Sequence, residues 1–401
     1  MKITKHILMA AVAIAACSCG SQKSDNPLFN EFTAPFGIAP FSEITIDHYR
    51  EGMLRGMEEQ KAEIEAIINN PEAPTYANTI AALDQCGTLL RKVRGTFSPL
   101  SSSNSNDEIR ALQREISPIS SAHSDDINLN PDLFARVKAV YEGSRRGLNE
   151  VDEKLLEDCY KGFARSGAAL SAEDKELYRK YTASLSEATL MFGQNALSAT
   201  NAYAINITDA AKVAELPDFV KEAMAADAAA RGEKGWTVTL KAPSYIPFMT
   251  YSSQREEKEK LYRAYNSRAL GGEFDNSDII RNITSLRLNI AKLLGYETYA
   301  DYVLEERMAE NATNVNEFLA ELREATLEYG RKDYAMINDY AHSLGLEGDV
   351  MPWDWAYYTE KYKSEKYAIN DEQVKPYLKL DNVIKGVFLL AEKLYGLTFV
   401  A

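Results

Sequence analysis

The stretches YAINI (Tyr203–Ile207) and WTVTL (Trp236–Leu240) decide the fold class, because the residue pattern of the chain changes only there. Each alternates in period two and is rich in β-branched and aromatic residues, which is typical of a half-buried strand. A short helical pattern over 217–230 and a turn at 232–235 connect them. We therefore predict one antiparallel pair of strands.

Helical periodicity occupies most of the chain on both sides of this pair. It begins after Thr45 and Asp47, two residue types that favour helix N-caps. The predicted fold class is therefore mainly α, a multi-helical lobe with one small antiparallel β insertion. The predicted helices cover residues 48–68, 75–94, 107–126, 131–141, 150–163 and 172–197, then two long amphipathic helices over 255–308 and a last helix from 383, with a polar loop at 101–106 and an aromatic turn at Met351–Tyr358.

The first residues have the pattern of an export signal. Lys2 and Lys5 precede a short apolar run at Ile7–Ala16, which is too short to span a membrane. Ile14-Ala15-Ala16-Cys17 resembles a bacterial lipobox, so Cys17 is the expected site of lipidation, with an ordinary cleaved signal as the alternative. We expect an exported, periplasmic protein that a lipid anchor holds at the outer membrane.

The segment Asn26–Phe41 contains three prolines and four phenylalanines. Prolines disfavour a continuous helix, so we expect an extended arm lying in a groove of the body. The charge balance of the whole chain, with 59 acidic against 45 basic residues and a net charge of −14, excludes a nucleic-acid binder. Basic and acidic residues are interspersed, as on solvated helix faces.

Residues that could carry chemistry are few. The only histidines are His6, His48, His123 and His342, and no two lie four positions apart, so the chain has no H-E-x-x-H pair. His48 is expected at a helix start, His342 near a helix C-terminus, and His123 in a polar helix end rather than a metal site. The sequence accordingly assigns no catalytic and no metal-binding residue.

Two cysteines, Cys86 and Cys159, fall in helical patterns among leucines. Buried free thiols are the favoured interpretation, because three cysteines beyond Cys17 make no disulfide framework. A disulfide between Cys86 and Cys159 is the alternative.

A series of strings resembles the thimet oligopeptidase/neurolysin family of zinc peptidases, over about residues 26–401. Those of the N-terminal half resemble its bacterial peptidyl-dipeptidase branch in particular. In the C-terminal half the matching strings are Arg255–Arg268, Ser285–Tyr299, Arg307–Ala309, Pro352–Tyr358 and Val374–Leu380. In the N-terminal half they are Asn26–Phe29, His48-Tyr49, Asn69–Asn78, Asn104–Asp107, Arg165–Leu170 and Gly193–Asn195.

The resemblance implies a bilobed helical body with a channel that admits short unfolded peptides. Members of the family carry H-E-x-x-H and a further glutamate as zinc ligands, after the segment matched here by Val374–Ala401, so no ligand can be carried over. Two accounts stay open: an N-terminal fragment of a longer reading frame, or a shortened, non-catalytic relative. The expected domains are a signal peptide at 1–16, a tether at 17–26, an N-terminal helical domain at 27–200, a β-containing insertion at 201–252 and the start of a catalytic domain at 253–401.

The implied function is a zinc metallopeptidase, a peptidyl-dipeptidase that removes C-terminal dipeptides from oligopeptides. Zinc would be bound by the full-length parent, expected to be a monomer, while the present chain alone is expected to bind none and to be inactive. The alternatives are an endo-acting oligopeptidase of the same family and a non-catalytic helical peptide-binding lipoprotein.

The aromatic turn supplies candidates for the wall of the channel, because aromatic rings can stack on peptide side chains. The alternative is that the turn packs lobe against lobe with its aspartate as a helix N-cap. A further expectation is that an apolar face near the end of the chain, with Leu389, Leu390, Leu394 and Phe399, lacks partners. The candidates for the channel wall are Trp353, Asp354, Tyr357 and Tyr358.

Overall fold

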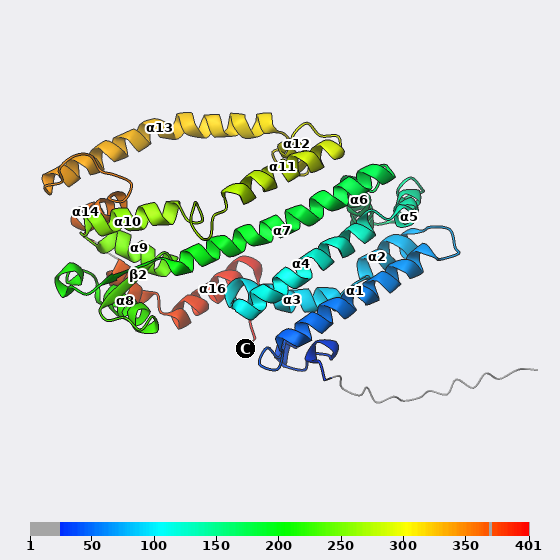
Figure 1. Cartoon of the computed structure of the whole chain (residues 1–401), viewed down its shortest axis with the longest axis horizontal. Coiled ribbons are helices and arrows are strands. Elements are labelled where there is room, and N and C mark those ends of the chain that lie inside the picture. The colour runs from blue at the N-terminus through cyan, green and yellow to red at the C-terminus, as the bar shows by residue number, and fades with distance from the viewer. Residues whose placement is uncertain (1–24, 369–370, 401) are drawn as a thin grey trace, which may run out of the picture. The chain divides into compact units, whose positions relative to one another are not determined.

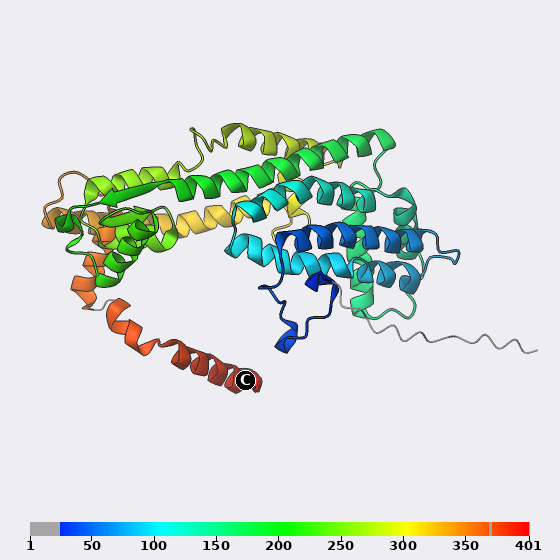
Figure 2. The ribbon, with the colours of Figure 1, turned by 60° about the horizontal axis from the view of Figure 1, so that its bottom comes forward.

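A computed structural model of the chain describes residues 25–368 and 371–400. Within them the chain is mainly helical and carries one small sheet, as the sequence predicts (Figure 1, Figure 2). The expected signal and Cys17 lie outside the described residues. The chain divides after Glu187 into two units. The finer division expected at residues 200 and 252 stays a prediction.

From residue 25 onward, the first unit contains helices and helical turns but no strand. The α-helices are α1 Ile46–Ile68, α2 Ala82–Gln85, α3 Thr88–Ser103, α4 Asp107–Asn128, α5 Pro131–Tyr141, α6 Glu150–Arg165 and α7 Ala172–Ala202, which runs into the second unit; Pro27–Phe29 and Pro35–Gly37 are 3-10 turns and Tyr76–Ala81 is a π-helical turn. The helices α1, α4, α5, α6 and α7 follow predicted helical segments, and most of them begin at an asparagine or threonine side chain that accepts a backbone N–H.

Two glycines let α1 approach α3 closely. A Cβ at Gly56 would lie 2.9 Å from the Cα of Leu90, and one at Gly52 would lie 3.0 Å from a methyl group of Val93. Small residues at such crossings bring helix backbones together and allow the flanking side chains to interlock. One core of the unit forms around this contact, from Leu28, Tyr49, Met53, Met57, Leu90, Val93, Phe97, Ile109, Leu112 and Ile116.

The single helix expected over 75–94 is wrong in the structure. The chain forms a π-helical turn and α2, breaks at Cys86 and Gly87, and continues as α3. Gly87 has φ +74°, a left-handed conformation that favours glycine and interrupts a helix. The polar loop expected at 101–106 is also shorter, because α3 runs on to Ser103, where Ser101 and Ser102 donate to backbone carbonyls within the helix.

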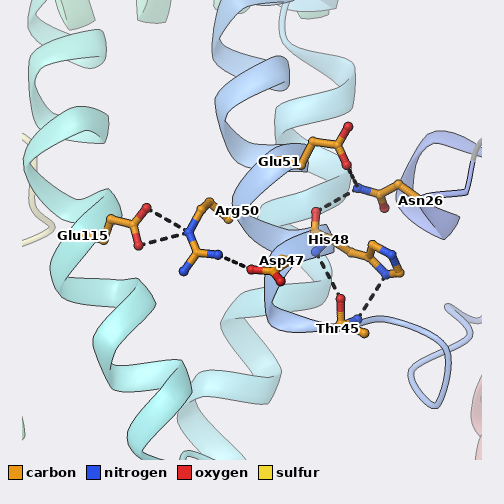
Figure 3. A network of polar contacts seen from close by, with 7 residues as sticks. All are labelled: Asn26, Thr45, Asp47, His48, Arg50, Glu51 and Glu115. Atoms are coloured by element: carbon orange, nitrogen blue, oxygen red, sulfur yellow. Dashed lines mark hydrogen bonds and ion pairs between the residues drawn. The ribbon is translucent and has the colours of Figure 1, made fainter.

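The N-terminal arm is anchored at its start by a polar network (Figure 3). The Asn26 amide nitrogen donates to the His48 carbonyl and to a Glu51 carboxylate oxygen, both at 3.0 Å. The Thr45 N–H in turn donates to the His48 ring, which confirms His48 as a helix-capping residue. Arg50 extends the network by bonding Glu115 on α4 at 2.9 Å.

Only part of this arm lies against the body. Leu28 is fully buried against α1 and α3, as a groove-bound arm requires. Phe36, however, is 94% exposed, and Ile38 and Phe41 are exposed as well. The prediction is wrong for this stretch. Pro35 starts a second 3-10 turn in which Phe36 is left-handed, so this turn does not follow the surface as an extended chain would.

A second core of the first unit contains both described cysteines. Both thiols are free, which confirms that part of the favoured interpretation; Cys86 is buried as expected, whereas Cys159 is only half-buried. Burial raises the pKa of the Cys159 thiol to about 11. Nearby, the rings of Tyr141 and Tyr160 stack with centroids 3.9 Å apart.

The second unit holds the sheet and the remaining helices. Strands β1 (Ala204–Ile207) and β2 (Trp236–Thr239) pair antiparallel with Ile205 opposite Val238, which confirms the predicted pair. Val238 lies in a core with side chains of the helices α8 to α10. The helices are α8 Asp218–Ala230, α9 Ala242–Tyr251, α10 Arg255–Asn266, α11 Ser277–Leu293, α12 Tyr299–Leu304, α13 Ala312–Ser343, α14 Trp355–Tyr367, α15 Asp371–Val374 and α16 Leu380–Tyr395, with 3-10 turns at Ala210–Val213 and Lys375–Tyr377.

Residues 255–308 form three helices instead of the two long ones expected. The chain leaves α10 at Asn266 and enters α11 at Ser277, through a loop in which Gly271 and Gly272 are both left-handed. Consecutive left-handed glycines break an amphipathic pattern that otherwise continues on both sides.

Two helices of this unit leave large apolar side chains exposed. On α13, the long yellow-to-orange helix of Figure 1, Phe318 is 60% exposed, and Leu319 and Leu322 are also exposed. On α16 and just after it, the face expected to lack partners is exposed within this chain, although the Phe399 ring stacks on that of Phe388 at 4.1 Å. That no partner covers this face stays a prediction. The face includes Leu389, Leu390, Leu394 and Phe399.

Candidate functional site

The aromatic segment at 352–358 is half turn and half helix. The chain turns up to Asp354, and α14 begins at Trp355. Trp353 is buried in the core of the second unit, where its ring meets that of Tyr262 at 6.0 Å and lies under the Arg263 guanidinium. Trp353 therefore serves packing in this unit.

Asp354 is an ion-pair partner inside the unit. Its carboxylate is 1% exposed and accepts from both Nε (3.1 Å) and Nη2 (2.9 Å) of Arg255, the first residue of α10. It also accepts the Met351 N–H at 3.1 Å, which closes the turn. Asp354 occupies the N-cap position of α14, but its side chain caps no backbone N–H of that helix. This bidentate pair joins the start of α10 to the start of α14.

A buried lysine lies beside this pair. Lys258 is 1% exposed, and its ammonium lies 4.2 Å above the ring of Tyr357. Burial lowers the pKa of Lys258 to about 8, with the negative charge of Asp354 opposing the shift. No sequence pattern singled out Lys258. Its spacing of three from Arg255 puts both cations on one face of α10, but only the folded structure shows that this face points inward.

Tyr357 forms part of the wall of a solvent-open pocket of about 640 Å³ in the second unit. The pocket lies among the ends of α9 and α13, the segment before α8, and α14. Its lining combines three carboxylates, one lysine, three tyrosines and a few apolar groups. The residues are Glu215, Pro217, Thr250, Tyr251, Tyr340, Leu344, Tyr357, Glu360, Lys361, Ser364 and Glu365.

Hydrogen bonds fix several of these side chains. The Tyr340 hydroxyl donates to a Glu365 carboxylate oxygen at 2.6 Å. Burial and this carboxylate together raise the pKa of Tyr340 to about 12, so the hydroxyl keeps its proton. Glu215 accepts the Ser253 N–H at 2.5 Å. The site thus offers preplaced acceptors and aromatic faces, which suits binding of a cationic or polar ligand.

Of the four residues proposed for a channel wall, Tyr357 lines this pocket, whereas Trp353 and Asp354 are buried and are not part of its lining. Tyr358 is half-buried next to Tyr357, with the two rings 5.1 Å apart. Their assignment to a channel stays a prediction.

The residues described do not fit a zinc site. Across 25–368 and 371–400 no three His, Cys, Asp or Glu side chains are grouped to hold a metal ion, and protein zinc sites need at least three ligands. The His123 ring bonds the Gln60 amide at 2.8 Å. His342, in the last turn of α13 as predicted, bonds the Gly348 carbonyl at 2.8 Å. Asp126 is the one carboxylate close enough to His123 to act on its pKa, so this histidine has no group of three metal-ligand side chains around it among the described residues.

The family follows from comparison with known proteins. Residues 248–401 match the model of peptidase family M3. This chain belongs to that family, which is the thimet oligopeptidase family of the sequence resemblance.

The relatives include dipeptidyl carboxypeptidases as well as oligopeptidases. Dipeptidyl carboxypeptidase of Salmonella typhimurium is 33% identical, over 94% of this chain and 56% of the relative. Oligopeptidase A of the same organism is 31% identical, over 93% of this chain and 55% of the relative. Probable cytosolic oligopeptidase A of Arabidopsis thaliana is 31% identical, over 94% of this chain and 54% of the relative. The chain spans about half the length of the curated relatives it matches.

The relatives also correct the expected location. The Arabidopsis relative, which aligns with nearly the whole chain, is named as a cytosolic enzyme. The exported, periplasmic, lipid-anchored location expected from the first 17 residues is therefore wrong. A ten-residue apolar run after two lysines is a short pattern, and it carries less information than an alignment of this extent. Among the described residues, no helix is both long enough and apolar enough to cross a membrane.

Proposed function

We propose that this chain is the peptide-binding part of a zinc metallopeptidase that removes C-terminal dipeptides from oligopeptides. The observation that carries the proposal is the alignment of 94% of the chain with a dipeptidyl carboxypeptidase. Short unfolded peptides are the proposed substrates. Zinc, bound by residues outside those described, would activate the water that attacks the peptide bond.

The pocket beside Tyr357 supports a peptide-binding role. Peptides offer backbone amides, side chains and a terminal amine, and the pocket offers carboxylate acceptors and tyrosine rings for them. Its volume of about 640 Å³ is in the range of ordinary small-ligand sites, large enough for one or two residues of a peptide.

An endo-acting oligopeptidase is the second candidate. It is favoured by the relatives named oligopeptidase A, which align over the same extent as the dipeptidyl carboxypeptidase. A peptide with a C-terminal amide separates the two activities. A dipeptide-releasing enzyme that requires a free C-terminal carboxylate loses activity on it, whereas an endo-acting enzyme cuts it internally.

The experiment that tests the proposal begins with the gene. Reading past codon 401 should reveal an in-frame H-E-x-x-H, and the longer product should release dipeptides from a hexapeptide until a chelator is added. Added zinc should restore the activity. A stop codon directly after Ala401 would instead favour a peptide-binding protein without catalysis.

The 401-residue chain provides a second arm of the test. It should show no chelator-sensitive cleavage of the same hexapeptide, because its described residues offer no grouped metal ligands. Chelator-sensitive hydrolysis by this chain, purified free of host peptidases, would contradict the proposal.

A further inference from the structure

We propose that the pocket among α9, α13 and α14 binds an alkylammonium or guanidinium cation, specifically the basic side chain of a peptide. The cation chemistry follows from the pocket itself. Only the choice of a peptide as its source rests on the proposed function.

The charge of the pocket lining favours a cationic ligand. The lining carries Glu215, Glu360 and Glu365 against Lys361, so three negative charges and one positive charge leave a formal net charge of −2. Each carboxylate has about four lone-pair sites. Glu365 accepts one bond from Tyr340 and Glu215 accepts one from the Ser253 N–H. Acceptor capacity therefore remains on both for a ligand with several N–H donors, such as a guanidinium.

Glu360 is the least exposed of the three carboxylates in the pocket lining. Its side chain is 16% exposed, and Lys363 approaches it at 3.4 Å, while the Ser364 hydroxyl donates to its other oxygen at 3.4 Å. Both contacts are long for charge-assisted or hydroxyl bonds. A ligand cation with ideal geometry would therefore improve on the partners that Glu360 has in the structure.

The tyrosine rings of the pocket lining also favour a cationic ligand. A cation within about 6 Å of an aromatic ring centre is attracted by the negative face of the ring. The protein already shows this with its own groups, because the ammonium of buried Lys258 lies 4.2 Å and that of Lys361 lies 5.0 Å from the ring centre of Tyr357. Of the two, only Lys361 belongs to the pocket lining. Lys361 is exposed and has a long flexible side chain. It is therefore an internal competitor that a bound cation displaces from the ring.

Apolar groups complete the fit. Leu344 and Pro217 line the same pocket and can cover the methylene stem of an arginine or lysine while its charged head meets the carboxylates. A neutral polar side chain of equal length would gain the apolar contacts but not the charge interactions. The pocket should therefore discriminate by charge rather than by size.

The experiment compares two peptides that differ only at the end of their central side chain. Pentapeptides with a central arginine or a central citrulline have nearly the same shape, but only the first is cationic. Titration of the 401-residue chain, followed by tryptophan fluorescence, should give a dissociation constant about tenfold lower for the arginine peptide. The preference should shrink as salt is raised, since the charges are partly exposed.

Substitutions assign the binding to this pocket and act in opposite directions. Glu360→Gln and Glu365→Gln should each raise the dissociation constant of the arginine peptide several-fold and leave that of the citrulline peptide unchanged. Lys361→Met should lower the dissociation constant of the arginine peptide, because it removes the lysine that competes for the Tyr357 ring. Glu256→Gln, an exposed glutamate of α10 outside the pocket lining, is the matched control and should change neither. Far-ultraviolet circular dichroism verifies that each variant is folded.

The outcomes separate this inference from the proposed function. Equal affinity for the two peptides, or a loss of affinity in Lys361→Met, overturns the cation pocket and leaves the peptidase proposal standing. If ethylguanidinium alone binds with the same dependence on Glu360 and Glu365 while neither peptide binds, the cation site is supported and its peptide source is rejected. Failure of the longer gene product to cleave peptides rejects the proposed function alone.

Discussion

Two helices of similar sequence character, α1 and α13, are covered by their surroundings to very different degrees. The 23-residue α1 buries seven residues along its whole length. The 32-residue α13 buries only Ile337 and Ala341, both near its C-terminal end. A hydrophobic stripe therefore predicts that a segment is helical, but it does not predict whether the structure around it covers that stripe.

The covered end of α13 is also where the candidate pocket lies. The Tyr334 hydroxyl donates to the Val350 carbonyl at 3.1 Å, and Asn338 accepts the Val350 N–H at 2.8 Å, so the chain after α13 is tied back onto it. Tyr334 also stacks on Trp355 of α14. A short stretch of well-bonded helix is thus enough to position Tyr340 and Leu344, while the rest of α13 carries exposed apolar residues.

The largest expected effect tests the anchor beneath α14. Asp354→Asn should destabilise the second unit by about 3 kcal/mol, because it leaves Arg255 and buried Lys258 without their carboxylate. All three tryptophans, at 236, 353 and 355, belong to this unit, so urea unfolding followed by tryptophan fluorescence reports on it. Asp278→Asn, which breaks an exposed pair with Arg281, is the control and should cost under about 0.5 kcal/mol. Equal effects of the two substitutions would show that Asp354 anchors nothing.

The next effect tests the close packing of α1. Gly56→Ala should destabilise the first unit by about 2 kcal/mol, because the added methyl meets the backbone of Leu90 at 2.9 Å and forces the helices apart. Gly95→Ala, in α3, meets nothing within 4 Å and should stabilise by about 0.5–1 kcal/mol through helix propensity. Thermal unfolding followed by circular dichroism measures both. Opposite signs are expected; a stabilising Gly56→Ala would mean that α1 and α3 are less closely packed than described.

A third effect concerns pH. Between about pH 8 and 10 the unfolded chain keeps the Lys258 proton while the folded chain releases it, so the unfolded state binds more protons and stability rises with pH. Lys258→Met lacks this contribution. The stability of the variant relative to the wild type should therefore fall by on the order of 1–2 kcal/mol from pH 7 to pH 10. Urea unfolding at both pH values gives the difference. A difference that does not change with pH would mean that Lys258 titrates like an exposed lysine.

The smallest effect on stability is expected on α16. Replacing Leu390 and Leu394 together by glutamate should change the unfolding free energy by less than about 0.5 kcal/mol, because both side chains are exposed. It should nevertheless lower the binding of a hydrophobic dye and the tendency to associate. Leu112→Glu, in the core of the first unit, is the contrasting substitution and should unfold that unit. Strong destabilisation by the α16 pair would show that this face is covered in solution.

The regular elements were the predictable part of this molecule. Alternation at Tyr203–Ile207 and Trp236–Leu240 located both strands, and three- and four-residue apolar spacing located most helices of the first unit. The helices α9, α13 and α14 of the second unit were not placed in advance. The breaks were not predicted. Gly87, Gly271 and Gly272 interrupt helical patterns through left-handed backbone, and the same residue type at Gly95 leaves a helix intact, so glycine alone does not mark a break.

The candidate site was less predictable than the fold. The aromatic string drew attention to Tyr357, but the carboxylates of its pocket come from separate parts of the chain, at Glu215 and on α14. No local pattern links such positions, because their proximity arises from the packing of α9, α13 and α14. Lys258 was hidden for the same reason: in sequence it is one lysine in a charged helix, and only tertiary packing makes it buried.

Cys86 and Cys159, the free thiols among the described residues of the first unit, can report on its local opening. A thiol with a pKa near 11 is almost wholly protonated at neutral pH, and only the thiolate reacts quickly with alkylating reagents. Cys86 is additionally shielded by burial. In a chain whose Cys17 and Cys19 are replaced by serine, the rate of labelling by iodoacetamide should therefore not exceed the rate at which this region unfolds locally. Mass spectrometry of the labelled chain over time would measure labelling at these two cysteines and so report on local unfolding of the first unit.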